Sequence, residues 1–356
     1  MTQEIAIAGI GAVAEVHARA IADIDDATLV AGSCRTDAKG REFAEEFDCE
    51  YYADTEAMLD GTDPDVLSVC TPSGAHLDPT LAAADRGVHV LCEKPLEITT
   101  DRVDEMVDAC EAAGVRLGGV FQGRYTGPVG RVHDAVAEGR FGDLSVVSAS
   151  VPWWREDDYY EGAWQGTEAL DGGGAVMNQS IHGVDAIQWI AGAGMDLDPG
   201  ENPVEEVFAF TDTLAHDGDH VEVEDTAVAT LRYRDGTLGH LLAATSMYPG
   251  SRKLLRVGGR DGTAEVAEDD LTTWAFRDGD SDEDGDGDDE SDGDKGGAAD
   301  PMAIDNRDHK RNIEAFLDAV AAGEPFMLDA AEARKAVAIV EAIYESADRG
   351  APVRVE

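Results

Sequence analysis

Short apolar runs alternate with amphipathic stretches along the first third of the chain. Runs rich in Ile, Val, Ala and Leu predict buried strands, and apolar positions at three- and four-residue spacing predict the helices between them. The expected strands are residues 5–8, 27–33, 65–70, 88–92 and 116–120, and the expected helices include residues 12–24 and 102–112. This alternation predicts an α/β domain with a doubly wound parallel sheet over residues 1–122.

The pattern changes after residue 122, where strand-like segments follow one another without helices between them. Such a succession is typical of a mainly antiparallel open sheet. A helix is expected at 129–138 and two more at 307–349, with strands near 144–151, 204–210, 223–233, 237–244, 254–257 and 264–266. We therefore expect a second, α+β domain over residues 123–356 for substrate binding and oligomerisation.

Residues 277–300 are a low-complexity run of Asp, Gly, Ser and Glu. Asp282-x-Asp284-x-Asp286-Gly287 fits the start of a calcium loop, but Gly293 stands where the twelfth position requires a bidentate Glu. The composition therefore favours a disordered, solvated insertion over a calcium site.

Charge narrows the choice of partners. The chain of 356 residues has 75 acidic and 27 basic side chains, a formal net charge of −48. Such a surface repels nucleic acid and anionic membranes, and it needs salt to screen its self-repulsion. This balance resembles proteins of extreme halophiles.

Apolar content and cysteines indicate a cytoplasmic protein. Apolar residues make up 43% of the chain, yet no run is long enough to span a membrane and no leader precedes the first strand. The five cysteines form no C-x-x-C pair, so we expect reduced thiols and no metal site.

A glycine motif follows the first expected strand. The spacing Gly9-x-Gly11-x-x-Ala14, between a strand and a helix, fits the dinucleotide fingerprint of a Rossmann domain. Gly9 permits the tight turn, and Gly11 permits a pyrophosphate to approach the helix N-terminus. The residues expected to hold the pyrophosphate are Gly9, Ile10, Gly11, Ala12 and Val13.

The end of the second strand bears on the choice of cofactor. An acid that would hold the ribose 2′-hydroxyl of NAD is missing there, and Ser33 and Arg35 could hold a 2′-phosphate. We expect NADP, with NAD as the alternative. Arg35 as a solvated loop residue is the competing interpretation.

Lys94 stands directly after the strand at 88–92, in Glu93-Lys94-Pro95. Ligands of open parallel sheets bind beyond the carboxyl ends of the strands, so this position favours a functional lysine over a solvated one beside a turn. Loops at the same edge complete the expected cofactor set with Thr71, Pro72, His76, Glu93, Lys94 and Gln122.

A second constellation opens with Gly172-Gly173-Gly174 and is expected to continue as a helix to about residue 190. Residues four apart share a helix face, so Asn178 and His182 should point the same way. Taken alone, His182 is better explained as a core histidine.

Aromatic residues gather in the stretch Trp153, Trp154, Tyr159, Tyr160 and Trp164. Flat apolar faces beside polar groups suit a sugar ring, and packing of a long loop or a subunit contact is the alternative. The expected substrate-binding residues are Arg124, Trp153, Arg155, Trp164, Asn178 and His182.

Together, the glycine fingerprint, Glu93-Lys94-Pro95 and the motif from Gly172 to Asp185 resemble the glucose–fructose oxidoreductase/inositol dehydrogenase (Gfo/Idh/MocA) family. The resemblance implies that Lys94 is the catalytic lysine, often preceding a cis-proline bond, and that His182 is the catalytic histidine. Asn178 departs from the family's usual Asp, although some nucleotide-sugar members carry Asn there. Pro72-Ser73 departs from its usual Pro-Asn.

These features predict an NAD(P)-dependent oxidoreductase that acts on a hydroxyl of a sugar, cyclitol or sugar derivative. Lys94 and His182 would take part in proton transfer, while the amide of Asn178 could orient a hydroxyl but not take its proton. A homodimer or homotetramer is expected. The alternatives are a non-catalytic NAD(P)/sugar-binding sensor on the same fold and an acidic interaction protein that binds a nucleotide.

Overall fold

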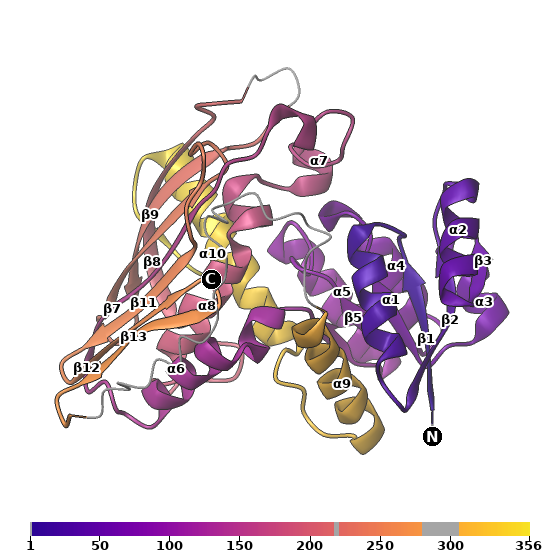
Figure 1. Cartoon of the computed structure of the whole chain (residues 1–356), viewed down its shortest axis with the longest axis horizontal. Coiled ribbons are helices and arrows are strands. Elements are labelled where there is room, and N and C mark those ends of the chain that lie inside the picture. Colours follow the sequence, from indigo (N-terminus) through magenta and orange to yellow (C-terminus); the bar gives the residue numbers. More distant parts are fainter. Residues whose placement is uncertain (1, 217–220, 280–305) are drawn as a thin grey trace, which may run out of the picture. The chain divides into compact units, whose positions relative to one another are not determined.

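The computed structural model describes residues 2–216, 221–279 and 306–356 (Figure 1). The predicted acidic insertion, from residue 280 on, and the calcium alternative that starts at Asp282 lie outside the described residues. The chain forms two compact units. The first contains the described residues of 1–125, 169–172 and 300–337, and the second contains the other described residues.

The first unit is built on a six-stranded sheet in the order β3-β2-β1-β4-β5-β6, with every neighbouring pair parallel. Its strands are β1 (Gln3–Ala8), β2 (Ala27–Ser33), β3 (Glu50–Tyr52), β4 (Val66–Val69), β5 (His89–Cys92) and β6 (Leu117–Gly119). Its helices include α1 (Ala12–Ala22), α2 (Asp37–Phe47), α3 (Thr55–Thr62), α4 (Leu77–Ala84) and α5 (Thr100–Ala113), with short turns η1 (Ser73–Ala75) and η2 (Gln122–Tyr125). The predicted doubly wound parallel sheet is confirmed.

Helix α9 (Arg307–Ala322) belongs to this first unit, whereas the sequence pattern assigned residues 123–356 to a second domain. Its buried face packs against α1, and the Asn312 side chain accepts a hydrogen bond from the backbone N–H of Phe121 (3.1 Å). Farther along, the N–H of Gly119 in β6 donates to the carbonyl of Leu328 (2.8 Å). The periodicity of a helix shows that it has an apolar face but not which sheet covers that face.

The second unit is built on an eight-stranded sheet in the order β13-β12-β11-β7-β10-β9-β8-β14. The strands are β7 (Leu144–Pro152), β8 (Val204–Asp212), β9 (Thr226–Tyr233), β10 (Leu238–Ala244), β11 (Leu254–Gly259), β12 (Gly262–Ala267), β13 (Asp270–Phe276) and β14 (Val353–Arg354). All neighbouring pairs are antiparallel except β7 and β10. The predicted mainly antiparallel sheet is confirmed.

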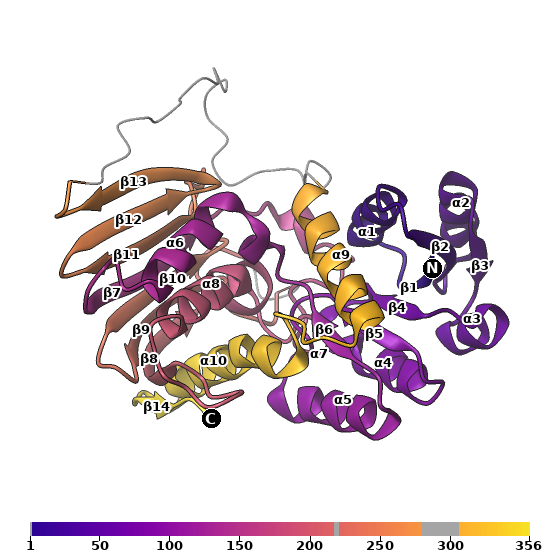
Figure 2. The same ribbon diagram turned by 90° about the horizontal axis from the view of Figure 1, so that it is seen from below.

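Helices lie along one face of this sheet (Figure 2). They include α6 (Gly127–Ala137) and α8 (Ile181–Gly192), and α10 (Ala330–Arg349) continues into this unit past Val337. Side chains of β9 alternate between buried and accessible along the strand, as expected for a sheet with one covered face.

The expected continuous helix from the glycine run to residue 190 is wrong. Residues Ala175–Gln179 form a π-helical turn, and α8 begins only at Ile181 after Ser180 leaves helical geometry (φ −101°, ψ 0°). Asn178 and His182 therefore belong to two elements, and their four-residue spacing does not place them on one helical face. The cause lies in the glycine run, whose close contacts are described below.

Two expectations from composition can be compared with the structure. None of the described helices has the length and apolarity needed to cross a membrane. All five cysteines are free thiols.

Candidate functional site

The turn between β1 and α1 has the geometry that a dinucleotide pyrophosphate requires. Gly9 has a positive φ of +88°, and a Cβ there would lie 2.7 Å from the backbone N of Thr71. Gly11 caps α1, and a Cβ at Gly11 would meet no heavy atom within 4 Å. Backbone N–H groups at this helix start are thus open to an anion, so the described residues fit the predicted cofactor.

Ser33 is the last residue of β2, and Arg35 follows the strand at its carboxyl end. The Ser33 side chain is buried, and its hydroxyl lies 3.1 Å from the Thr55 hydroxyl, while Arg35 is exposed. Asp37, the first acid after the strand, forms an ion pair with Arg41 one turn along α2 (3.0 Å). The exposed guanidinium of Arg35 therefore remains a candidate to bind the 2′-phosphate of NADP at this edge.

His76 braces the backbone of the two loops that follow β4 and β5. One ring nitrogen lies 2.9 Å from the carbonyl oxygen of Thr71, and the other lies 2.9 Å from that of Pro95. The side chain is buried, at 1% exposure. These contacts indicate that His76 supports the cofactor edge through the backbone, a role that the sequence pattern did not suggest.

Lys94 follows directly after β5, at the same sheet edge as the glycine turn, and its peptide bond to Pro95 is cis. Its backbone N–H donates to the carboxylate of Glu93 (3.1 Å), which is buried at 5% exposure. Gln122 opens η2 after β6, also at this edge.

Arg124 was predicted to bind substrate, yet its guanidinium donates to Glu332 of α10 at 2.9 Å and is almost fully buried. These contacts tie η2 to the start of α10 within the first unit. They favour a bracing role for Arg124.

The second unit gathers several predicted substrate residues into one polar network. Arg155 donates to the side-chain oxygen of Gln179 (2.8 Å), and the Gln179 amide donates to the Tyr159 hydroxyl (2.9 Å) and to Asn178 Oδ1 (3.2 Å). The Arg155 guanidinium also lies 5.3 Å from the centre of the Trp153 ring. Gln179, which the sequence analysis did not single out, therefore connects Arg155 to Asn178, and Trp153 joins the network through Arg155.

His182 lies in the first turn of α8 and is half-buried. Trp164 is also half-buried, in the loop between η3 (Asp157–Tyr159) and α7 (Glu168–Asp171). Both belong to the second unit, whereas Lys94 belongs to the first.

The close packing of Glu224 explains why a glycine is needed at residue 174. The sequence analysis did not identify Glu224. Its carboxylate accepts from the N–H groups of Gly174 and Val176 (both 2.8 Å) and from the Tyr344 hydroxyl (3.0 Å). A Cβ on Gly174 would lie 1.9 Å from the carbonyl oxygen of Glu224. Burial raises the pKa of Glu224 above its ordinary value, although these three hydrogen bonds oppose the shift.

A buried pair of His216 and Asp225 contacts the backbone of the aromatic stretch at Arg155. Their side chains lie 3.0 Å apart, and the other ring nitrogen of His216 lies 2.9 Å from the carbonyl oxygen of Arg155. Burial would raise the pKa of Asp225, but hydrogen bonds from His216 and from backbone N–H groups hold it well below its usual range. The hydrogen bond to Asp225 raises the pKa of His216.

Comparisons with known proteins agree with this architecture. Residues 3–120 match an oxidoreductase family with an NAD-binding Rossmann fold, and residues 129–265 match the GFO/IDH/MocA C-terminal domain. The chain is 27% identical to D-glucoside 3-dehydrogenase of Escherichia coli over 378 aligned positions, covering 99% of this chain and 97% of that protein.

Two further relatives extend the comparison. D-xylose 1-dehydrogenase (NADP(+)) 2 of Haloferax volcanii is 28% identical, with 86% of this chain and 85% of that protein covered. The WlbA dehydrogenase of Bordetella pertussis, solved with NADH and UDP-GlcNAcA, superposes with a TM-score of 0.85 at 28% identity over 100% of this chain and 99% of that one. From its NAD(P)-binding Rossmann unit to its second sheet, the chain belongs to the Gfo/Idh/MocA family of oxidoreductases.

Proposed function

We propose that the protein oxidises or reduces a hydroxyl-bearing carbon of a sugar, cyclitol or sugar derivative with a nicotinamide cofactor. One observation carries the proposal: Lys94 follows β5 at the sheet edge where the glycine turn after β1 is open to a dinucleotide. A lysine at this edge, beside the expected cofactor site, is placed to exchange a proton with a substrate hydroxyl during hydride transfer.

In the oxidation direction, the substrate carbon gives up a hydride and its hydroxyl gives up a proton. Bound nicotinamide supplies the hydride acceptor. Lys94 in its amine form takes the hydroxyl proton and becomes ammonium, and His182 is the second residue proposed for proton transfer. Loss of such a group typically lowers the rate by about 10²–10⁴-fold.

The network of Arg155, Gln179 and Asn178 is proposed to bind the polar rim of the substrate. Amide and guanidinium groups that are held by one another keep a fixed orientation, which lowers the entropy lost on binding. The rings of Trp153 and Trp164 are the proposed apolar platform. Asn178 would orient a substrate hydroxyl through a hydrogen bond. Its amide would not serve as a base, because it cannot accept the hydroxyl proton.

The experiment that tests this function is a screen for substrate-dependent cofactor reduction. Aldoses, inositols, uronic acids and nucleotide sugars are each incubated with the protein and NADP or NAD at high salt, and reduced nicotinamide is followed by its absorbance. The proposal expects turnover with at least one of these classes. Tight binding of a sugar without any cofactor reduction would instead support the sensor alternative.

We propose that NADP is preferred, since Arg35 is exposed at the end of β2 and Asp37 is paired with Arg41. Replacing Arg35 by Asp should remove the cation that pairs with the 2′-phosphate and place an acid where NAD binding uses one. We expect the ratio of kcat/KM for NADP over NAD to fall by about tenfold or more, the value of about one charge-assisted contact. Equal kcat/KM values for both cofactors in the unchanged protein would contradict this.

We also propose that folding and activity require high salt. A net charge of −48 repels itself, and the screening length falls to about 3 Å at 1 M salt. The melting temperature should therefore rise steeply with potassium chloride, and sucrose, which favours compact states without screening charge, should not replace it. Retention of full structure in salt-free buffer, measured by circular dichroism, would count against this proposal.

A homodimer through the open face of the second sheet is proposed as well. Phe210 of β8 and Val228 of β9 are cross-strand partners with exposed fractions of 67% and 48%. Leu238 of β10 and Val146 of β7 form a second exposed cross-strand pair. An exposed apolar patch of this kind marks an interaction surface. Phe210→Asp with Val228→Asp should yield monomers by light scattering, and Met327→Asp, at an exposed apolar position of the first unit, should not. A monomeric unchanged protein would refute it.

A further inference from the structure

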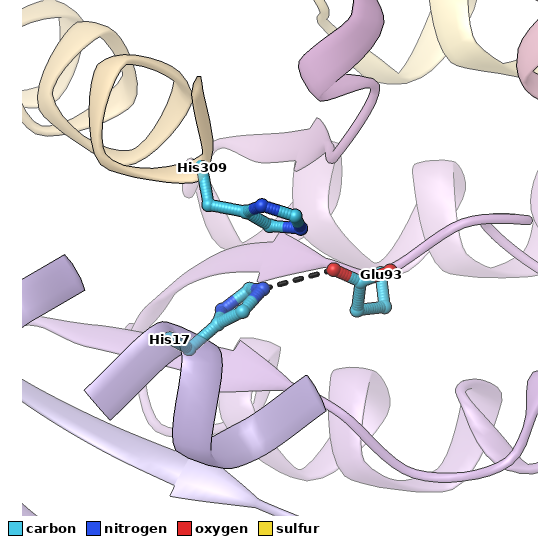
Figure 3. Close-up of side chains that lie close together, drawn as sticks. All are labelled: His17, Glu93 and His309. Carbon is cyan, nitrogen blue, oxygen red and sulfur yellow. Dashed lines mark hydrogen bonds and ion pairs between the residues drawn. The ribbon is translucent and has the colours of Figure 1, made fainter. Parts of the chain in front are cut away.

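Three buried ionisable side chains of the first unit, including Glu93 directly before Lys94, lie close together (Figure 3). His17 comes from α1, Glu93 from the end of β5 and His309 from α9, with exposures of 0%, 5% and 3%. Neither the cofactor fingerprint nor the substrate network uses His17 or His309. Burying three such groups is costly unless they are paired, so their arrangement requires a reason.

The contacts of Glu93 connect helix α1 to the backbone of Lys94. One carboxylate oxygen lies 2.9 Å from Nε2 of His17, and the other accepts the backbone N–H of Lys94 at 3.1 Å. Nδ1 of His17 lies 2.8 Å from the hydroxyl of Ser68 in β4. Both ends of the carboxylate are therefore occupied, and the imidazole that holds it is itself fixed in orientation.

The surroundings favour a charged pair beside a neutral ring. Burial would lower the pKa of His17, but its contacts with Cys70 and Glu93 raise it to about 10. Burial would raise the pKa of Glu93, but the hydrogen bond and charge of His17, with the nearby charge of Lys94, lower it to about 2. Burial lowers the pKa of His309 to about 4, so this ring is neutral and closes the third side of the pair.

A metal ion fits the cluster less well than the ion pair does. The three donor atoms all lie within 4.8 Å of one another, but His17 Nε2 and Glu93 Oε1 are only 2.9 Å apart, closer than two ligands that each lie about 2.0–2.2 Å from a tetrahedral zinc ion. Binding a metal would also require His17 Nε2 to give up the proton that it shares with Glu93. The direct contact of 2.9 Å between two of the three donors therefore favours a pair without metal.

We propose that His17 and Glu93 are positioning residues for Lys94. The carboxylate, held by the His17 imidazolium, fixes the backbone N–H of Lys94 and thereby the start of its side chain. His76 fixes the same loop one residue later, through the carbonyl oxygen of Pro95. This inference rests on the proposed role of Lys94 in proton transfer, because a misplacement of about 1 Å can cost about 10²-fold in rate.

The first test does not depend on substrate. In long-range proton–nitrogen spectra of the full chain with isotope-labelled histidine, each imidazole shows whether it carries one proton or two. His17, assigned by its loss in His17→Gln, should be doubly protonated at neutral pH, and His309 should be neutral. A neutral His17, or stoichiometric zinc in the purified protein, would overturn the proposal.

The second test is a double-mutant comparison with the substrate found in the screen. His17→Gln keeps a hydrogen-bond donor but leaves Glu93 without its cation, so the pKa of Glu93 should rise. We expect kcat to fall about 10- to 100-fold with the affinity for cofactor unchanged, and the acidic limb of the kcat profile to move to higher pH. The double variant His17→Gln with Glu93→Gln has two neutral amides in place of the ion pair. It should recover part of kcat and abolish the shift of the acidic limb.

His89→Gln is the matched control. His89 lies at the opposite end of β5, where its ring accepts the backbone N–H of Arg116 (2.9 Å). This variant should keep the kcat and pH profile of the unchanged protein. If His17→Gln also keeps both while Lys94→Met is inactive, the positioning role fails and the proposed function stands. If Lys94→Met remains active, the proposed function itself fails, and the positioning role fails with it.

Discussion

Lys94→Met is expected to lower kcat by about 10²–10⁴-fold, which corresponds to roughly 3–5 kcal/mol of activation free energy. The methionine side chain is unbranched like that of lysine and only one atom shorter, but it has no amine to accept a proton. Affinity for the cofactor should persist, because pyrophosphate binding relies on backbone groups from Gly9 to Val13 and on the start of α1. Steady-state kinetics and fluorescence titration of the cofactor measure the two effects separately.

Lys310→Met provides the control for this result. Lys310 is a partly exposed lysine on α9 of the same unit, paired with Glu314 at 2.8 Å, and its removal should leave kcat unchanged. His182→Ala should lower kcat in the same direction as Lys94→Met, while Asn178→Ala should mainly raise KM. A Lys94→Met protein with a near-normal rate would make the lysine a bystander.

Gly174→Ala is expected to have the largest effect on the stability of the second unit. Its new methyl group would lie 1.9 Å from the carbonyl oxygen of Glu224, and a backbone atom cannot move aside as a flexible side chain can. The hydrogen bond from Gly174 N–H to the Glu224 carboxylate would be disturbed as well. We expect a loss of about 3 kcal/mol or more, seen as a lower melting temperature and denaturant midpoint.

Gly127→Ala is the matched control for that change. Gly127 lies in the first turn of α6 in the same unit, and a Cβ there would meet nothing within 4 Å. Alanine has the higher helix propensity, but a Cβ directly before Pro128 is disfavoured in helical geometry, so this variant should change stability by far less than Gly174→Ala does. Equal melting temperatures for Gly174→Ala and the unchanged protein would show that the loop relaxes around the methyl group.

Much of the first sheet could be predicted from the sequence, because its strands are buried on both faces and are continuous apolar runs. The run at β1, for example, keeps Ile5, Ala6, Ile7 and Ala8 at 1% exposure or less. The edge strand β3 was missed because its three residues, Glu50, Tyr51 and Tyr52, are not a buried run. Strand signals are weakest where a sheet meets solvent.

The positions of the candidate site residues on the fold could be predicted where the motifs are local, but contacts between distant segments could not. The glycine turn and the position of Lys94 after β5 follow from short motifs. Glu224 and His216 act through residues 50 and 61 positions away in the sequence, so no local spacing could indicate them. The π-helical turn before Ser180 also depends on such a partner, since the Glu224 carboxylate accepts the N–H of Val176 in the turn and of Gly174, its N-cap.

The most direct test of the central claim is transfer of deuterium from substrate to cofactor. The best substrate of the screen is prepared with deuterium on the carbon that carries the reacting hydroxyl, and the reduced nicotinamide is analysed by mass spectrometry. The account predicts that each reduced cofactor gains one deuterium and that Lys94→Met forms almost none. Reduced cofactor without deuterium, or no reduced cofactor with any sugar, cyclitol or sugar derivative, would contradict it.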